Sequence, residues 1–205
     1  MSHITRVLFD LDGTLFDTQR FHAETEVALL SEYGVSMSAD ALTQRFAGRP
    51  TELVFMEALD CSKETAKKLT AKKWELLYPR AEEARALADL ALLFRELKQR
   101  NVQFSIGTAS PKEWAESLLS INNLEHYFEP GTIVGGDMVA RGKPFPDIWE
   151  LASQGTPPDE CLVVEDGLAG IEAARTAGMR GALLLPRTHA HAHTIGTLDD
   201  ILALL

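Results

Sequence analysis

The sequence predicts an α/β fold: a Rossmann-like parallel-sheet core with an inserted helical cap. Short apolar segments alternate with helical segments of about ten residues or more, which favours a parallel sheet covered on both faces. The first two apolar segments are separated by roughly ninety residues, which is too many for a simple crossover connection. The extra residues therefore indicate an insertion between the first and second strands.

Five strands are expected in the core, at about 4–9, 102–107, 132–135, 161–165 and 181–185. In open parallel sheets, ligands bind beyond the carboxyl ends of the strands. Polar motifs follow several of these apolar segments directly, so we expect one edge of the sheet to carry the functional site.

The insertion is predicted to form several helices, the first from Thr18 to Tyr33 with its end at Gly34. Three polar residues that can accept N–H bonds at a helix start, Ser38, Thr51 and Ser62, are expected to begin the next three. We therefore assign 17–86 to the cap and 1–16 plus 87–205 to the core, with the second hinge near 83–87.

Composition limits the class of protein. Of the 205 residues, 45% are hydrophobic and 24% are charged, which is typical of a globular protein. No apolar run of about 18 residues predicts a membrane span, and the N-terminus has no signal-peptide pattern. Two cysteines, Cys61 and Cys161, indicate neither a disulfide framework nor a zinc site. A cytoplasmic location is expected.

The net charge of −10 argues against a nucleic-acid partner, because such binding depends on clustered Lys and Arg. An anionic substrate would need local positive charge, which a bound cation, Lys143, Lys112 and Arg49 could supply. A monomer is the default expectation for a chain of this size.

Two acids follow the first apolar strand. Asp10 and Asp12 are two residues apart, so in an extended strand both face the same side. Carboxylates this close repel each other unless a cation or a shared proton compensates. The pair suits a divalent metal and two acids with different roles, although Asp and Gly together are also common in turns.

Four segments together resemble the motifs of the haloacid-dehalogenase-like hydrolases. In chain order they are FDLDGTLFDT, the strand FSIG with Thr108-Ala109-Ser110, Lys143 in GKPFPDIW, and CLVV with Glu165-Asp166-Gly167. The resemblance covers almost the whole chain, and the set is more specific than any one motif. With its inserted helical cap, the chain is similar to the beta-phosphoglucomutase-like and sugar phosphatase branch of subfamily I.

The resemblance implies roles for four residues. Asp10 would be a nucleophile that forms an aspartyl-phosphate, and Asp12 a general acid/base. Dehalogenases and phosphonate-cleaving members lack an acid at the second position, so Asp12 favours phosphoryl transfer. Thr108 would hold a phosphate oxygen, and Lys143 would offset charge on the nucleophile and the phosphate.

A metal site is expected at the same strand ends. Adjacent acids after an apolar strand are costly to bury without a cation, and oxygen ligands suit Mg2+. The resemblance implies Asp10, the backbone carbonyl of Asp12 and Asp166 as ligands. Glu165 would act directly or through water.

The segment Ser110-Pro111-Lys112-Glu113 has the pattern of a capping box at a helix start. A helix N-terminus attracts anions, so Ser110 and Lys112 are candidates for binding the substrate. The same pattern fits a helix that is only well capped.

Three cap residues are further candidates. Thr18 and His22 are four residues apart, on one face of the first cap helix, and the resemblance places them over the active site. Arg49 resembles the cap position that meets the distal group of the substrate. A half-buried histidine and a surface arginine are the alternatives.

Two other groups are expected to have no functional role. Lys72 and Lys73 resemble a further cap lysine, but we expect a solvated helix face. His189, His191 and His193 alternate in a segment beyond the last predicted strand, where we expect an exposed loop.

These features predict a Mg2+-dependent phosphatase that acts on a small phosphorylated metabolite such as a sugar or polyol phosphate. The alternative is a phosphomutase like beta-phosphoglucomutase, which would use the same two aspartates. A non-catalytic sensor of phosphorylated metabolites is a third hypothesis. The pair Asp10 and Asp12 argues against it, because binding alone requires neither a nucleophile nor an acid.

Overall fold

The structure, a computed structural model, describes residues 3–46, 50–184, 194–195 and 197–205. The chain divides into two compact units: a core of Met1–Asp17 and Arg85–Leu205, and a cap of Thr18–Ala84. The predicted cap of 17–86 is longer by one residue at its start and by two at its end.

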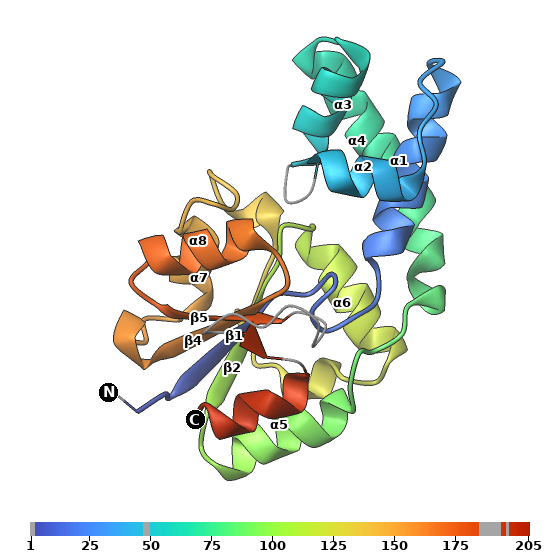
Figure 1. The fold of residues 1–205 in the computed structure, drawn as a ribbon. Coiled ribbons are helices and arrows are strands. Elements are labelled where there is room, and N and C mark those ends of the chain that lie inside the picture. The colour runs from blue at the N-terminus through green and yellow to red at the C-terminus, as the bar shows by residue number, and fades with distance from the viewer. Residues whose placement is uncertain (1–2, 47–49, 185–193, 196) are drawn as a thin grey trace. The chain divides into compact units, whose positions relative to one another are not determined.

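The core contains a parallel sheet with the strand order β3-β2-β1-β4-β5-β6 (Figure 1). The strands are β1 (Arg6–Phe9), β2 (Gln103–Gly107), β3 (Ile133–Val134), β4 (Cys161–Glu165), β5 (Arg180–Leu184) and β6 (Thr194–Ile195). The predicted α/β class and the five predicted strands are confirmed. The sixth strand was missed because Thr194 and Ile195 do not belong to an apolar run of the sequence.

The register of the sheet positions the site. Phe9 at the end of β1 pairs with Ile106 of β2 on one side and with Val164 of β4 on the other. The three strands therefore end at nearly the same level. The polar residues that follow them, far apart in sequence, meet at one edge of the sheet.

Helices cover both faces of this sheet. They are α5 (Leu90–Gln99), α6 (Lys112–Ile121), α7 (Asp147–Ala152) and α8 (Leu168–Thr176). Short 3-10 turns are η2 (Glu125–Tyr127), η3 (Gly136–Met138), η4 (Pro158–Glu160) and η5 (Leu198–Ala203). Helices α7 and α8 lie on one face, and α5 and η5 lie on the other (Figure 1).

Apolar packing holds both faces to the sheet. Leu8 and Val163 of the sheet pack with Ile148 and Trp149 of α7 in one buried cluster. On the other face, Phe94 of α5 stacks on Phe104 of β2 with 4.9 Å between ring centroids. Removal of this apolar area from water stabilises the core and fixes the strand ends that carry the site.

The cap is helical and has its own apolar core. Its helices are α1 (Gln19–Glu32), α2 (Ala39–Phe46), α3 (Thr51–Leu59) and α4 (Lys63–Leu77), followed by the 3-10 turn η1 (Tyr78–Glu83). The buried apolar cluster consists of Ala23, Leu29, Leu30, Leu42, Phe46, Val54, Phe55, Ala66 and Leu69.

Two of the three predicted helix caps are present. The Ser38 hydroxyl accepts the Ala41 N–H at 3.1 Å, and the Ser62 hydroxyl accepts the Thr65 N–H at 3.2 Å. The prediction for Thr51 was wrong. Pro50 is the N-cap of α3, and Thr51 lies inside the helix.

The expectation of a solvated face is correct for Lys72 and wrong for Lys73. Lys72 is exposed and pairs with Glu32. Lys73 is only 2% exposed, and its Nζ lies 2.6 Å from Glu26 Oε1 and 2.8 Å from the Thr51 hydroxyl. A buried charge of this kind is tolerated because it is paired and hydrogen-bonded.

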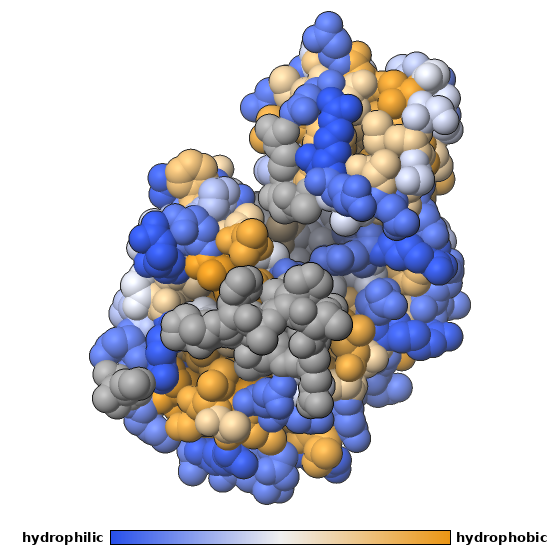
Figure 2. Space-filling model, in the orientation of Figure 1, coloured by the Kyte–Doolittle hydropathy of each residue, from blue (hydrophilic) through white to orange (hydrophobic). Residues whose placement is uncertain are grey.

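Hydrophilic residues make up most of the face drawn in Figure 2, and hydrophobic residues gather in several places on the core. In the part of the chain that the structure describes, no helix combines the length and the apolar character needed to span a bilayer.

The buried pair in the cap yields a stability prediction. Glu26→Ala is expected to destabilise the protein by about 3–5 kcal/mol, because the Lys73 ammonium would stay buried without its carboxylate. Glu32→Ala, which removes the exposed partner of Lys72, is the matched control and should cost less than about 1 kcal/mol. Urea unfolding measures both, and equal losses would contradict the assignment.

Candidate active site

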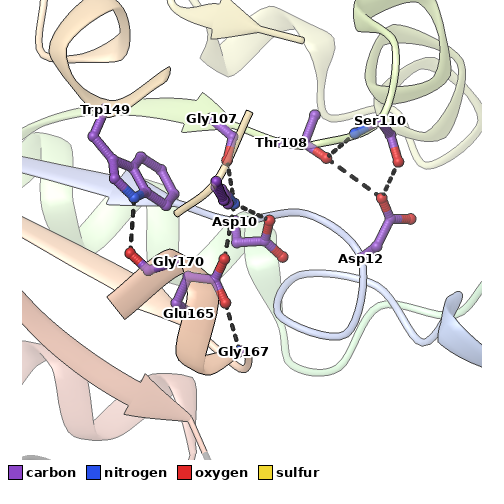
Figure 3. A network of polar contacts seen from close by, with 10 residues as sticks. Asp10, Asp12, Gly107, Thr108, Ser110, Trp149, Glu165, Gly167 and Gly170 are labelled. Atoms are coloured by element: carbon purple, nitrogen blue, oxygen red, sulfur yellow. Dashed lines mark hydrogen bonds and ion pairs between the residues drawn. The ribbon is translucent and has the colours of Figure 1, made fainter. Parts of the chain in front are cut away.

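A buried ammonium group links the ends of three strands. Lys143 Nζ lies 2.7 Å from Asp10 Oδ1 and 2.8 Å from Glu165 Oε1, and it donates to the Gly107 carbonyl at 3.0 Å. The Asp10 N–H in turn donates to the Val164 carbonyl at 2.9 Å. The predicted nucleophile and its lysine are therefore in direct contact at the carboxyl edge of the sheet. Figure 3 shows Asp10, Gly107 and Glu165 at this edge.

Burial shifts Asp10 and Asp166 toward their neutral forms. It raises the pKa of Asp10 well above the ordinary value; Lys143 opposes the shift, whereas Glu165 and Asp166 add to it. Burial, with repulsion from Glu165, raises the pKa of Asp166 to about 7. Burial also disfavours the Lys143 ammonium, but Asp10 and Glu165 outweigh this and raise its pKa. The three acids therefore favour a further positive charge.

The acid cluster fits a divalent cation. Asp10, Glu165 and Asp166 each offer a carboxylate oxygen, and these atoms lie within 4.8 Å of one another. Carboxylate oxygens are the ligands that Mg2+ takes, together with several waters. The Asp12 carboxylate does not belong to this group. Its predicted contribution is the backbone carbonyl, and that contribution stays a prediction.

The Glu165 side chain packs against Gly170, a glycine that the sequence analysis did not single out. A Cβ atom built at Gly170 in α8 would overlap the Glu165 carboxylate, so only glycine fits there. The Gly170 carbonyl accepts the Trp149 indole N–H at 3.0 Å, and the Trp149 ring lies 4.3 Å from Lys143 Nζ. A glycine inside a helical pattern is unfavourable and could have signalled this close approach.

Asp12 has different surroundings from Asp10. Its Oδ2 accepts the Ser110 hydroxyl and lies 3.4 Å from the Thr108 hydroxyl, as Figure 3 shows. Its Oδ1 accepts the indole N–H of Trp114 at 2.9 Å. The structure thus brings together three predicted site residues, Asp12, Thr108 and Ser110. It adds Trp114, which sequence reasoning missed.

The predicted capping box at Ser110 was wrong. Helix α6 has Pro111 as its N-cap and no side-chain cap bond, because the Ser110 hydroxyl is turned to the carboxylate described above. Asp137 accepts the Lys112 N–H at 2.9 Å instead. The Lys112 ammonium pairs with Glu116 along α6, and its role in substrate binding stays a prediction.

The predicted cap residues lie in a separate unit. Thr18 is buried at the N-cap of α1, and its carbonyl accepts the His22 N–H at 3.3 Å. The His22 ring meets Trp74 edge-on, 5.5 Å between centroids. Their contacts with substrate stay predictions. Four predicted positions lie outside the described residues: Arg49, His189, His191 and His193.

Comparison with known proteins identifies the family. Residues 7–184 match the family model described as haloacid dehalogenase-like hydrolase. The chain belongs to the haloacid dehalogenase-like hydrolase family. It is 30% identical over 177 residues to the fructose-1-phosphate phosphatase YqaB of Escherichia coli, covering 84% of this chain and 92% of that protein.

Other relatives of this haloacid dehalogenase-like hydrolase agree. A phosphorylated carbohydrates phosphatase of Thermotoga maritima is 31% identical over 180 residues, covering 84% of this chain and 81% of that protein. The crystal structure of a family IA, variant 3 hydrolase from Entamoeba histolytica has a TM-score of 0.84 at 27% identity, covering 96% of this chain and 95% of that one. The predicted family and the predicted enzyme class, a phosphoric monoester hydrolase, are confirmed.

Metal binding is expected to be linked to proton release. The pKa of Asp166 rises from the ordinary 3.8 to about 7, so the folded metal-free protein retains a proton that the unfolded chain has lost. Its stability therefore falls as the pH rises through this range, and Mg2+ must displace the proton. The rise in melting temperature with Mg2+ should be larger at about pH 8 than at about pH 6. Asp166→Asn should lose most of this rise in melting temperature. An equal rise at both pH values in the wild type would contradict the linkage.

Proposed function

We propose that this hydrolase is a Mg2+-dependent phosphatase that cleaves a small phosphorylated metabolite through an aspartyl-phosphate at Asp10. The observation that carries the proposal is the separation of two neighbouring acids. Asp10 lies against Lys143 in the acid cluster, whereas Asp12 lies among the donors Ser110 and Trp114. Acids kept in distinct environments can take distinct roles in one reaction.

In the first half of the reaction, an oxygen of Asp10 attacks the phosphorus atom of the ester. The bond from phosphorus to the ester oxygen breaks, and Asp12 gives its proton to the leaving alcohol. Lys143 offsets the charge of the nucleophile. Mg2+, held by Asp10, Asp166 and the Asp12 carbonyl, would neutralise charge on the phosphoryl oxygens.

In the second half, Asp12 takes a proton from a water molecule that attacks the phosphorus of the aspartyl-phosphate. The bond from phosphorus to Asp10 breaks, which releases inorganic phosphate and restores both acids. Thr108 is proposed to hold a phosphoryl oxygen. Glu165 already accepts from Lys143 and from the Gly167 N–H, which favours an action on the metal through water.

A sugar or polyol phosphate is the proposed substrate class, because the two phosphatase relatives described above are named for phosphorylated carbohydrates. Thr18, His22 and Arg49 are proposed to select the substrate from the cap. The net charge of −10 argues against a nucleic-acid partner. We also propose that the protein has no membrane partner and that it acts as a monomer in the cytoplasm.

The nucleophile is tested with a panel of phosphate esters in the presence of Mg2+, by measurement of released phosphate. The wild type should hydrolyse its best ester at about 1 per second or faster. Asp10→Asn should lower this rate by several orders of magnitude, because an amide is not a nucleophile here. Asp199→Asn, an exposed acid on η5, is the matched control.

Three outcomes would contradict this proposal. An Asp10→Asn rate above roughly a tenth of the wild-type rate would exclude the aspartyl-phosphate. Isomerisation of beta-glucose 1-phosphate that depends on a bisphosphate, with negligible phosphate release, would establish the mutase instead. Binding without turnover across the panel would establish a sensor.

A further inference from the structure

Trp114 contacts the proposed general acid although no motif contains it. It lies in the first turn of α6, its side chain is 0% exposed, and its indole N–H donates to Asp12 Oδ1 at 2.9 Å. An indole nitrogen can donate a hydrogen bond but cannot accept one. Asp12 Oδ1 is therefore the acceptor in this contact, whatever the protonation state of the carboxyl group.

The other carboxyl oxygen faces groups of a different kind. Asp12 Oδ2 is bonded to the Ser110 hydroxyl and lies 3.4 Å from the Thr108 hydroxyl. A hydroxyl can donate to a carboxylate and, after rotation, accept from a carboxylic acid. The two oxygens of Asp12 are therefore not equivalent. A proton on Oδ2 can remain hydrogen-bonded to a hydroxyl, whereas a proton on Oδ1 would face the Trp114 indole N–H, which cannot accept it.

The start of α6 is fixed in place, so the indole cannot easily move aside. The Lys112 N–H donates to Asp137 at 2.9 Å, and the Gly136 N–H donates to the Ser110 carbonyl at 2.8 Å. A Cβ atom at Gly136 would overlap the Ala109 carbonyl oxygen, so the two loops are in direct contact. These contacts fix the start of α6 and, with it, the position of the indole N–H next to Asp12.

We propose that Trp114 is a positioning residue for Asp12: it keeps Oδ1 as a hydrogen-bond acceptor, so that the proton passed to the leaving alcohol is carried on Oδ2. This inference rests on the proposed function, in which Asp12 protonates the alcohol. Loss of the indole N–H would remove the donor that fixes Oδ1, so either oxygen could then take the role of the acceptor.

The leaving group separates this role from a structural one. An alkyl phosphate such as a sugar phosphate has a poor leaving group and needs the proton of Asp12, whereas p-nitrophenyl phosphate has a good one and does not. Trp114→Phe keeps a ring and removes the N–H. It should lower kcat/KM for the alkyl ester about tenfold more than for the aryl ester, a loss of about 1.4 kcal/mol of transition-state stabilisation.

Trp149→Phe is the matched control. Trp149 is also 0% exposed and also gives up an indole N–H bond, to the Gly170 carbonyl. It lies beside Lys143, on the side of the nucleophile, so its loss should slow both esters by the same factor. Circular dichroism and melting temperature report whether each variant is folded. If Trp114→Phe does not fold, Trp114→Met also removes the N–H and allows the same comparison of the two esters.

A second comparison uses Asp12→Asn, which removes the acid itself. In that background, Trp114→Phe should no longer change the ratio of the kcat/KM values for the two esters, because both substitutions affect the transfer of the same proton. Equal slowing of both esters by Trp114→Phe, or a selective loss that persists without Asp12, would overturn the inference while the phosphatase stands. A wild type that hydrolyses neither ester would overturn both.

Discussion

The site depends on one buried cation, the Lys143 ammonium between Asp10 and Glu165. It joins Asp10, which directly follows β1, to the last residues of β2 and β4. It also permits the acids to stay next to each other out of water. Without it, burial and mutual repulsion would drive Asp10 further toward its neutral form, in which it cannot attack phosphorus. The sheet register and the glycine at position 170 both serve to keep this contact in place.

Much of the fold was predictable, because its signals are local. The apolar strands, the pair Asp10 and Asp12, and the caps at Ser38 and Ser62 all follow from short stretches of sequence. The motifs of the family located the acids and the lysine that the structure brings together. Strand β6, by contrast, lies outside the apolar runs of the sequence, so no local pattern indicated it.

The remaining features depend on partners distant in sequence. Ser110 matches a helix cap, but Asp12 takes its hydroxyl, and Asp137 bonds the helix start instead. The sequence around Lys73 is typical of a solvated helix face, and only the fold shows that Glu26 lies beside it as a buried partner. Trp114 counts as an ordinary apolar residue of an amphipathic helix, since only the fold reveals the acceptor of its N–H. In each case the sequence specified the residue but not its partner.

The central claim is that Asp10 carries the phosphoryl group. It is tested most directly by mixing Asp12→Asn with a phosphate ester and Mg2+, quenching with acid, and mapping the peptides by mass spectrometry. Because this variant lacks the base that activates water, the account predicts a phosphoryl group that accumulates on Asp10 when the ester has a good leaving group. A phosphoryl group on another residue, or hydrolysis at the full rate by a wild type that never carries one on Asp10, would contradict it.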